Sequence, residues 1–176
     1  DLKKQITKDG SMSLYSFDYG EGFHDTDGAF NESINKYLLP AQLDNFSNKT
    51  KINILDVCMG LGYNTGFILE ELLKSNHKIE WHGLEIDQRP LDIALNEKKI
   101  HQVWSPKVLE FFQSLKKAGS WSEGFHEGTI HWGDARQKIY EINDLLTFDV
   151  ILLDPFSPQK CPELWSEQFI SLLSCK

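Results

Sequence analysis

The chain has 176 residues, of which 40% are hydrophobic and 12% aromatic, which is typical of one globular domain with a buried core. Its formal net charge of −8 argues against an extensive basic face for nucleic acid, although a local basic strip is still possible. We see neither an apolar stretch of about 20 residues that would span a membrane nor a secretory leader in residues 1–20, so we expect a cytoplasmic protein without membrane contact.

Cysteine and histidine spacing argues against metal and disulfide frameworks. The three cysteines form no CxxC pair, and the six histidines show no HxH or HExxH spacing. We therefore expect free thiols and no metal. The chain stops at Lys176 directly after an expected helix, so we expect a truncated single domain, with residues 1–50 as an N-terminal extension and 51–176 as the cofactor-binding core.

The apolar pattern predicts strands and helices in alternation. Residues 12–23 alternate loosely and indicate a short hairpin, and Asp27 is a candidate cap for a helix over 28–43. Another amphipathic helix, over 105–118, is interpreted as an insertion. The remaining pattern predicts strands over 52–58, 79–86, 128–132 and 148–153, and helices over 63–74, 90–98, 135–145 and 162–174. Such repeats predict an α/β, Rossmann-like fold, with a mostly parallel sheet and helices on both faces.

The four predicted strand ends carry the main functional signal. Ligands of such sheets bind beyond the carboxyl ends of the strands. The ends here are Cys58–Gly62, Glu85–Asp87, Gly133–Asp134 and Asp154–Pro158. Three of them contain an acidic residue, and the first has Asp56 just inside the strand, so we predict a ligand site at this edge.

The glycine loop LDVCMGLGYNTG, residues 55–66, is close to a dinucleotide fingerprint but does not fit it. A GxGxxG loop presents helix N–H groups to a pyrophosphate, whereas here Thr65 takes the third glycine position. The spacing from Asp56 to Gly62 suits the methyltransferase motif D-x-G-x-G-x-G, with Cys58 at the first glycine. S-adenosylmethionine has no phosphate and needs only a close backbone approach, which glycine permits. A tight turn without a ligand is the alternative.

Two further acids follow the middle strands. Glu85 is placed to bind the ribose hydroxyls of NAD or S-adenosylmethionine alike, and Asp87 is its nearby competitor. Asp134 is placed to accept the adenine amino proton, to cap the helix over 135–145, or to do both.

The stretch FDVILLDPFSPQKCPELW, residues 148–165, indicates the chemistry. An acid followed by proline and an aromatic residue is similar to the D/N-P-P-Y loop of enzymes that methylate exocyclic nitrogen. Asp154 can hold and orient an amine, and Phe156 can pack on a base or exclude water. The alternative is a turn that ends the strand, with Phe156 in the core.

Here the sequence resembles the methyltransferase part of the MnmC-like enzymes of tRNA 5-methylaminomethyl-2-thiouridine biosynthesis. The family pattern at the last loop is D-G-F-A-P-x-x-N-P-x-x-W, and the residues kept in this chain are Asp154, Phe156, Pro158, Pro162 and Trp165. The family's G-x-G-x-G-x-N loop is matched at Gly60, Gly62 and Asn64, and its two later acids fall on Glu85 and Asp134.

The resemblance implies a class I methyltransferase fold, with further strands beyond Lys176. It implies methyl transfer from S-adenosylmethionine to the aminomethyl nitrogen of a wobble uridine in tRNA, with Asp154 and Phe156 at the substrate. The predicted cofactor-binding residues are Gly60, Leu61, Gly62, Asn64, Glu85, Ile86, Asp134, Ala135 and Asp154. Many family members carry a downstream FAD-dependent oxidase domain, but this chain has no second glycine fingerprint, so we predict no FAD.

Two other functions stay open. The acidic charge favours a methyl- or aminopropyl-transferase that acts on a small amine, and the glycine loop leaves a nicotinamide-dependent oxidoreductase possible. The sequence predicts neither the oligomeric state nor which tRNAs are modified.

Overall fold

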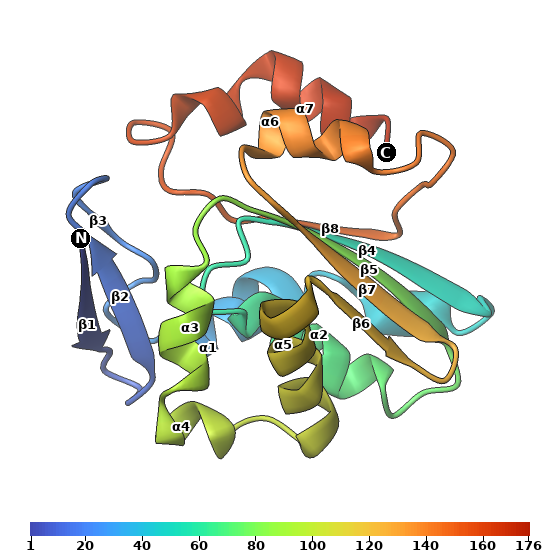
Figure 1. The fold of residues 1–176 in the computed structure, drawn as a ribbon, viewed down its shortest axis with the longest axis horizontal. Helices are drawn as coiled ribbons and strands as arrows, with labels where there is room; N and C mark the ends of the chain where they lie inside the picture. Colours follow the sequence, from blue (N-terminus) through green and yellow to red (C-terminus); the bar gives the residue numbers. More distant parts are fainter.

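A five-stranded sheet lies at the centre of the computed structural model, which describes residues 1–176 (Figure 1). The strand order is β6-β7-β5-β4-β8. The parallel strands are β4 (Lys51–Val57), β5 (Lys78–Glu85), β7 (His126–Trp132) and β8 (Val150–Leu153). The predicted α/β fold with a mostly parallel sheet is therefore confirmed.

One strand of this sheet was not predicted. β6 (Ser120–Glu123) pairs antiparallel with β7 at the sheet edge. Gly119 and Gly124 bracket it, both with positive φ, so β6 is a four-residue strand between two turns. Four residues are too few to show a period, so the sequence pattern does not reveal this strand.

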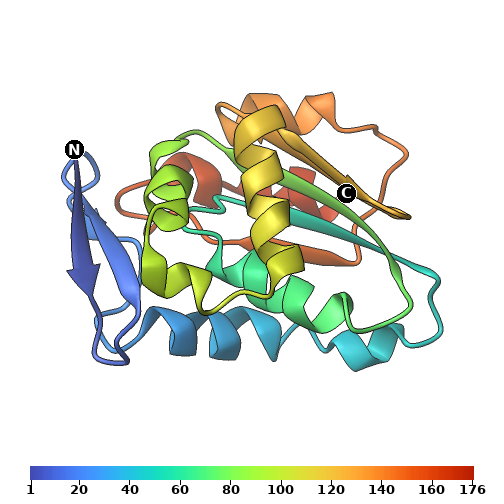
Figure 2. The same ribbon diagram turned by 60° about the horizontal axis from the view of Figure 1, so that its bottom comes forward.

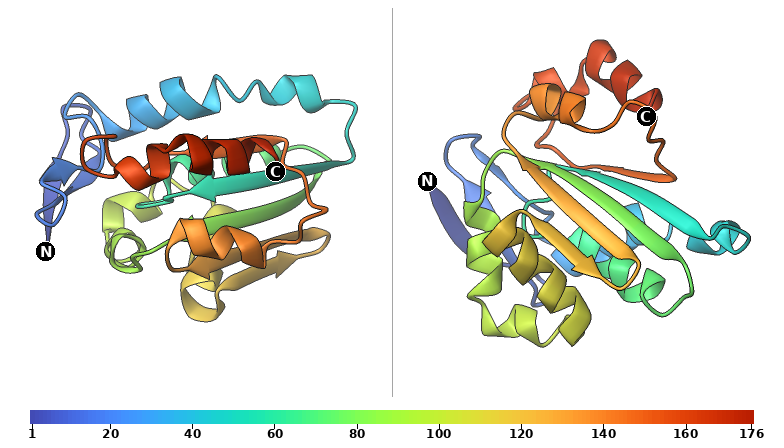
Figure 3. Two further views of the ribbon diagram at one scale, coloured as in Figure 1. Left: turned by 90° about the horizontal axis from the view of Figure 1, so that it is seen from above. Right: turned by 45° about the vertical axis from the view of Figure 1, so that its right-hand side comes forward.

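Helices cover both faces of the sheet (Figures 1 and 3). On one side lie α2 (Tyr63–Leu72), α3 (Arg89–Leu95), α4 (Lys98–His101) and α5 (Pro106–Ala118). On the other side lie α6 (Ala135–Lys138) and α7 (Glu167–Ser174). Two separate hydrophobic clusters, one on each face, hold these layers to the sheet. The faces separate because successive side chains of a strand point in opposite directions: Ile54 joins one cluster and Leu55 the other.

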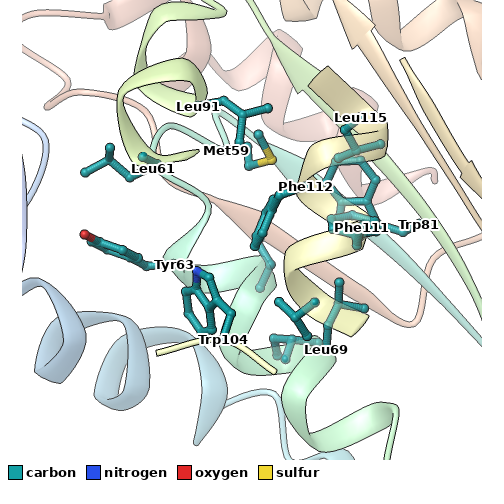
Figure 4. Close-up of a cluster of buried hydrophobic side chains, with 14 of the residues drawn as sticks. Met59, Leu61, Tyr63, Leu69, Trp81, Leu91, Trp104, Phe111, Phe112 and Leu115 are labelled. Atoms are coloured by element: carbon teal, nitrogen blue, oxygen red, sulfur yellow. The ribbon is translucent and has the colours of Figure 1, made fainter. Parts of the chain in front are cut away.

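The helix over 105–118, which the sequence analysis interprets as an insertion, is part of the cover of the sheet. As α5 it packs against β6 and β7, and Phe111 and Phe112 enter the cluster that Figure 4 shows. Its ends follow from local chemistry: Ser105 Oγ accepts from the N–H of Val108, and Gly119 ends the helix in a left-handed conformation.

Two glycines of the predicted cofactor loop allow this cluster to pack closely. A Cβ at Gly62 would lie 2.6 Å from the ring of Phe112, and a Cβ at Gly66 would lie 2.5 Å from the ring of Trp104. Both rings are labelled in Figure 4. Close packing of aromatic rings therefore requires glycine at both positions.

Three predicted helices are shorter than expected. The helix over 28–43 consists of α1 (Ala29–Ser33) followed by a π-helical turn, Ile34–Leu38. The helix over 135–145 is α6 followed by a 3-10 turn, Ile139–Glu141. The helix over 162–174 is a 3-10 turn, Pro162–Trp165, followed by α7.

The N-terminal segment forms a second, antiparallel sheet. The predicted hairpin over 12–23 corresponds to β2 (Met12–Ser16) and β3 (Glu21–Gly22), and β1 (Leu2–Ile6) adds a strand that was not expected. This sheet stands beside one end of the large sheet, next to α3 (Figure 2). Met12 and Leu14 belong to the larger core cluster, which fixes the small sheet in place. None of the helices has the length and apolar character of a membrane span.

Candidate functional site

A cavity of about 710 Å³ lies at the carboxyl ends of the parallel strands, with the N-terminal sheet as its opposite wall. Backbone hydrogen bonds hold three strand ends side by side: Cys58 N donates to Leu84 O, and Asp154 N donates to Val57 O. The cavity lining contains nine acidic and three basic residues, so its potential is negative and favours a cationic ligand.

The structure brings most of the predicted site residues to this cavity, but not all. Those that line it are Gly60, Glu85, Ile86, Asp134, Ala135, Asp154 and Phe156. Leu61, Gly62 and Asn64 are buried behind the wall and do not line it. Leu61 packs in the core, and the left-handed Gly62 lies against Phe112.

Glu85 is held firmly in the cavity wall. One carboxylate oxygen accepts from the N–H of Gly60 at 2.9 Å, and the other accepts from Ile86 N at 2.7 Å and Asp87 N at 2.9 Å. Only 7% of Glu85 is exposed, and burial raises its pKa. Its competitor Asp87 binds the guanidinium of Arg89, which lowers the pKa of Asp87 although its partial burial opposes this. Glu85 is therefore the better-oriented acceptor for a polar ligand.

Asp134 takes the capping position that the sequence left open. Its carboxylate accepts from the N–H of Arg136 at 2.9 Å and caps α6, and the Arg136 guanidinium binds it through Nε and Nη2. This pair lowers the pKa of Asp134. A contact of Asp134 with adenine stays a prediction.

The loop after β8 presents Asp154 and Phe156 to the cavity. Asp154 is half-buried, and desolvation raises its pKa. The indole N–H of Trp165 donates to the carbonyl of Phe156 at 2.7 Å, which closes the loop on itself. Two of the aromatic residues that carried the family resemblance are thus joined by a hydrogen bond.

The N-terminal sheet supplies site residues that the sequence analysis did not identify. The ring of Tyr19 stacks on Phe156, with centroids 4.3 Å apart, and the ring of Phe23 meets Phe156 edge-on at 5.1 Å. Glu21 accepts from the N–H and the hydroxyl of Ser157, at 3.1 and 2.9 Å. The turn Y-G-E-G-F at residues 19–23 was a signal for a hairpin, but nothing local in it indicates the loop that it contacts.

His24 lines the cavity next to the N-terminal sheet. Its Nδ1 lies 3.0 Å from the hydroxyl of Ser13 in β2. Burial lowers the pKa of His24 to about 4, so the ring is neutral at pH 7.

A buried polar chain lies behind the glycine loop. Trp81 Nε1 donates to Thr65 Oγ1 at 2.9 Å, and the Thr65 hydroxyl donates to Asp56. Burial raises the pKa of Asp56 to about 7, and its other oxygen has no hydrogen-bond partner. Thr65, which stands where the dinucleotide fingerprint has its third glycine, therefore supplies the hydrogen bond to this buried carboxyl group.

The donor set suits a cofactor without phosphate. A pyrophosphate would require the first N–H groups of α2 at the cavity, but residues 62–65 are buried and do not line it. The N–H of Gly60 donates to Glu85 instead. An acidic wall and fixed carboxylate acceptors match a cationic ligand that carries hydroxyl groups. No group of three or more His, Cys, Asp or Glu side chains is arranged to hold a metal ion.

Comparisons with known proteins agree with this chemistry. Residues 96–176 match the model of a family described as S-adenosyl-L-methionine-dependent methyltransferase. The crystal structure of MNMC2 from Aquifex aeolicus superposes with a TM-score of 0.82 at 30% identity, covering 99% of this chain and 56% of that one.

Two curated relatives are similar over most of this chain. An uncharacterized protein of Methanocaldococcus jannaschii is 30% identical over 168 residues, which are 93% of this chain and 44% of that protein. The tRNA 5-methylaminomethyl-2-thiouridine biosynthesis bifunctional protein MnmC of Azoarcus sp. (strain BH72) is 27% identical over 177 residues, which are 91% of this chain and 26% of that protein. The chain thus spans less than half the length of these relatives.

The fold, the site and the family match agree on one class: the chain is similar to S-adenosylmethionine-dependent methyltransferase domains. Within that class it is MnmC-like, as the sequence predicted.

Proposed function

We propose that this protein transfers the methyl group of S-adenosylmethionine to the aminomethyl nitrogen of a modified wobble uridine, aminomethyl-2-thiouridine, in tRNA. The observation that carries the proposal is the half-buried carboxylate of Asp154 at the wall of an acidic cavity, followed by Phe156. The names of the MnmC relatives support tRNA as the substrate class.

Residues on three strand ends would hold the cofactor. Glu85 would accept from the ribose hydroxyls through Oε2, which accepts a single hydrogen bond within the protein, from the N–H of Gly60, whereas Oε1 already accepts two. Ile86 and Ala135 would flank the adenine, with Asp134 near its amino group, and Gly60 would allow a close approach of the methionine end. When bound, the cofactor supplies an electrophilic methyl group on a positively charged sulfur.

Asp154 would bind the substrate amine and take a proton from it. An aliphatic ammonium must lose one proton before its nitrogen has a lone pair, and a nearby carboxylate can accept that proton. The rings of Tyr19, Phe23 and Phe156 form an apolar wall beside it. Such a wall excludes water and favours a cation near the ring faces.

The tRNA backbone would lie outside this acidic cavity. Lys98 and Lys99 of α4 and Lys117 of α5 are exposed and form no ion pair, so they are free to contact phosphates. A tRNA substrate also implies a cytoplasmic location, which is part of the proposal.

The negative cavity favours a second candidate, a small cationic amine as the methyl acceptor. Labelled S-adenosylmethionine would therefore be offered with tRNA that carries aminomethyluridine, with the same tRNA unmodified, and with a polyamine. Transfer only to the modified tRNA supports the first candidate, and transfer only to the polyamine overturns it.

Calorimetry tests the cofactor independently. We expect S-adenosylhomocysteine to bind and NAD not to bind. Binding of NAD alone would overturn the methyltransferase proposal and favour a nicotinamide-dependent oxidoreductase. Asp154→Asn should lower turnover by about 100-fold or more, and its affinity for S-adenosylhomocysteine separates lost binding from lost transfer. Asp44→Asn, which removes an exposed carboxylate outside the cavity lining, is the control.

A further inference from the structure

Two side chains hold the Asp154 carboxylate from behind. The hydroxyl of Tyr37 donates to Oδ1 at 2.6 Å, and Nδ2 of Asn64 donates to Oδ2 at 2.8 Å. Neither Tyr37 nor Asn64 lines the cavity. Both carboxylate oxygens are therefore fixed on their inner side, and the lone pairs that remain are left for a ligand.

Tyr37 reaches Asp154 from a distant part of the chain through an unusual turn. It lies in the π-helical turn Ile34–Leu38, where Leu39 N donates to Ile34 O at 2.9 Å. Single π turns are rare and often occur at functional sites, because the wider turn re-aims the side chains that follow. The Tyr37 hydroxyl also lies 3.3 Å from the carbonyl of Leu153, the last residue of β8, so it sits directly against the strand end that carries Asp154.

The two donors act against the effect of burial on the charge. Desolvation raises the pKa of Asp154, while the hydrogen bonds from Tyr37 and Asn64 lower it. The remaining charges near the group are Glu32, which raises its pKa, and Lys36, which lowers it; these two are paired with each other. The charge of Asp154 in turn raises the pKa of Asp56, which is buried behind the site.

We propose that Tyr37, together with Asn64, is a positioning residue for methyl transfer, which clamps Asp154 in one orientation and keeps it ionised. An ionised Asp154 can take a proton from the substrate ammonium: the N–H bond breaks, its electron pair stays on nitrogen, and the proton bonds to a carboxylate oxygen. The inference rests on the proposed function for this step, but the clamp itself is a property of the protein alone.

Tyr37→Phe tests the clamp, because it removes the hydroxyl and keeps the ring. The matched control is Tyr63→Phe, which removes another tyrosine hydroxyl with a protein acceptor, the carbonyl of Met12 at 2.6 Å, outside the cavity lining. The first readout is a carbon-13 NMR titration of the Asp154 carboxyl, assigned with Asp154→Asn. We expect its midpoint to move to higher pH in Tyr37→Phe and to stay in place in Tyr63→Phe.

The second readout is the pH profile of methyl transfer. In Tyr37→Phe the acidic limb of kcat should move to higher pH, and kcat on that limb should fall by roughly ten-fold or more, the usual loss for a hydrogen bond to a charged group. KM for S-adenosylmethionine should not change. In Tyr63→Phe the profile should match that of the wild type.

The outcomes separate the clamp from the proposed function. An Asp154 midpoint that does not move in Tyr37→Phe overturns the clamp, whatever the substrate is. A midpoint that moves in a protein that methylates no amine supports the clamp and refutes the proposed function. Equal shifts in both tyrosine variants would mean a general loosening of the fold, and would also overturn the clamp.

Discussion

Replacing Asp56 with asparagine should stabilise the protein at neutral and higher pH. Asp56 is fully buried, one of its oxygens has no hydrogen-bond partner, and burial raises its pKa from 3.8 to about 7. The charges of Asp154 and Glu85 add to the rise, and the hydrogen bond from Thr65 opposes it. A buried carboxylate with so few partners is costly in its ionised form.

The sign follows from the number of protons that each state binds. Between about pH 4 and about pH 7 the unfolded chain has lost the Asp56 proton while the folded protein keeps it, so stability falls as pH rises through this window. The full cost remains above the folded pKa. Folding raises the pKa of Asp56 from 3.8 to about 7, and at about 1.36 kcal/mol for each pKa unit this lowers the free energy of unfolding by about 4 kcal/mol above the folded pKa. Asparagine does not ionise and avoids this cost.

Urea unfolding followed by tryptophan fluorescence, at about pH 5 and about pH 8.5, gives the free energy of unfolding of each variant. The advantage of Asp56→Asn over the wild type should be small at the lower pH and should grow to a few kcal/mol at the higher. Asp44→Asn controls for the loss of one negative charge. If Asp56→Asn gains nothing at the higher pH, the cost that we assign to the buried carboxylate is wrong.

Three further predictions concern the glycine loop and the acid after β5. Cys58 has a left-handed φ of 69°, which strains any residue with a Cβ, so in urea Cys58→Gly should be about 1 kcal/mol more stable than Cys58→Ala, the reverse of the usual order. A clear advantage for alanine would show that this backbone conformation is not strained. Gly66→Ala drives a Cβ into Trp104 and should cost about 1–3 kcal/mol in the same assay; an unchanged midpoint would show that the ring moves aside freely. Glu85→Gln should weaken S-adenosylhomocysteine binding about ten-fold or more by calorimetry, whereas equal losses in Glu85→Gln and Asp87→Asn would leave Glu85 with no special role.

The local pattern of the sequence was enough to predict the central architecture. Alternating buried strands and amphipathic helices imply a parallel sheet, and a parallel sheet brings its carboxyl ends to one edge. Glu85, Asp134 and Asp154 could therefore be placed at a common edge before any contact was known. Each lies at the end of its own predicted strand, so its position depends only on where that strand ends.

Contacts between distant segments required the tertiary structure. Tyr37 and Asp154 are 117 residues apart, and Glu21 and Ser157 are 136 apart, so no local period relates them. The sequence predicted Asn64 as a cofactor residue, but the structure places it behind the cavity, bonded to Asp154. The glycine loop shows the same division most clearly. The spacing of its glycines predicts where the chain turns. Only the tertiary structure shows that Gly62 lies against the ring of Phe112 and Gly66 against the ring of Trp104. These rings come from other segments of the chain, so no local pattern could predict the contacts.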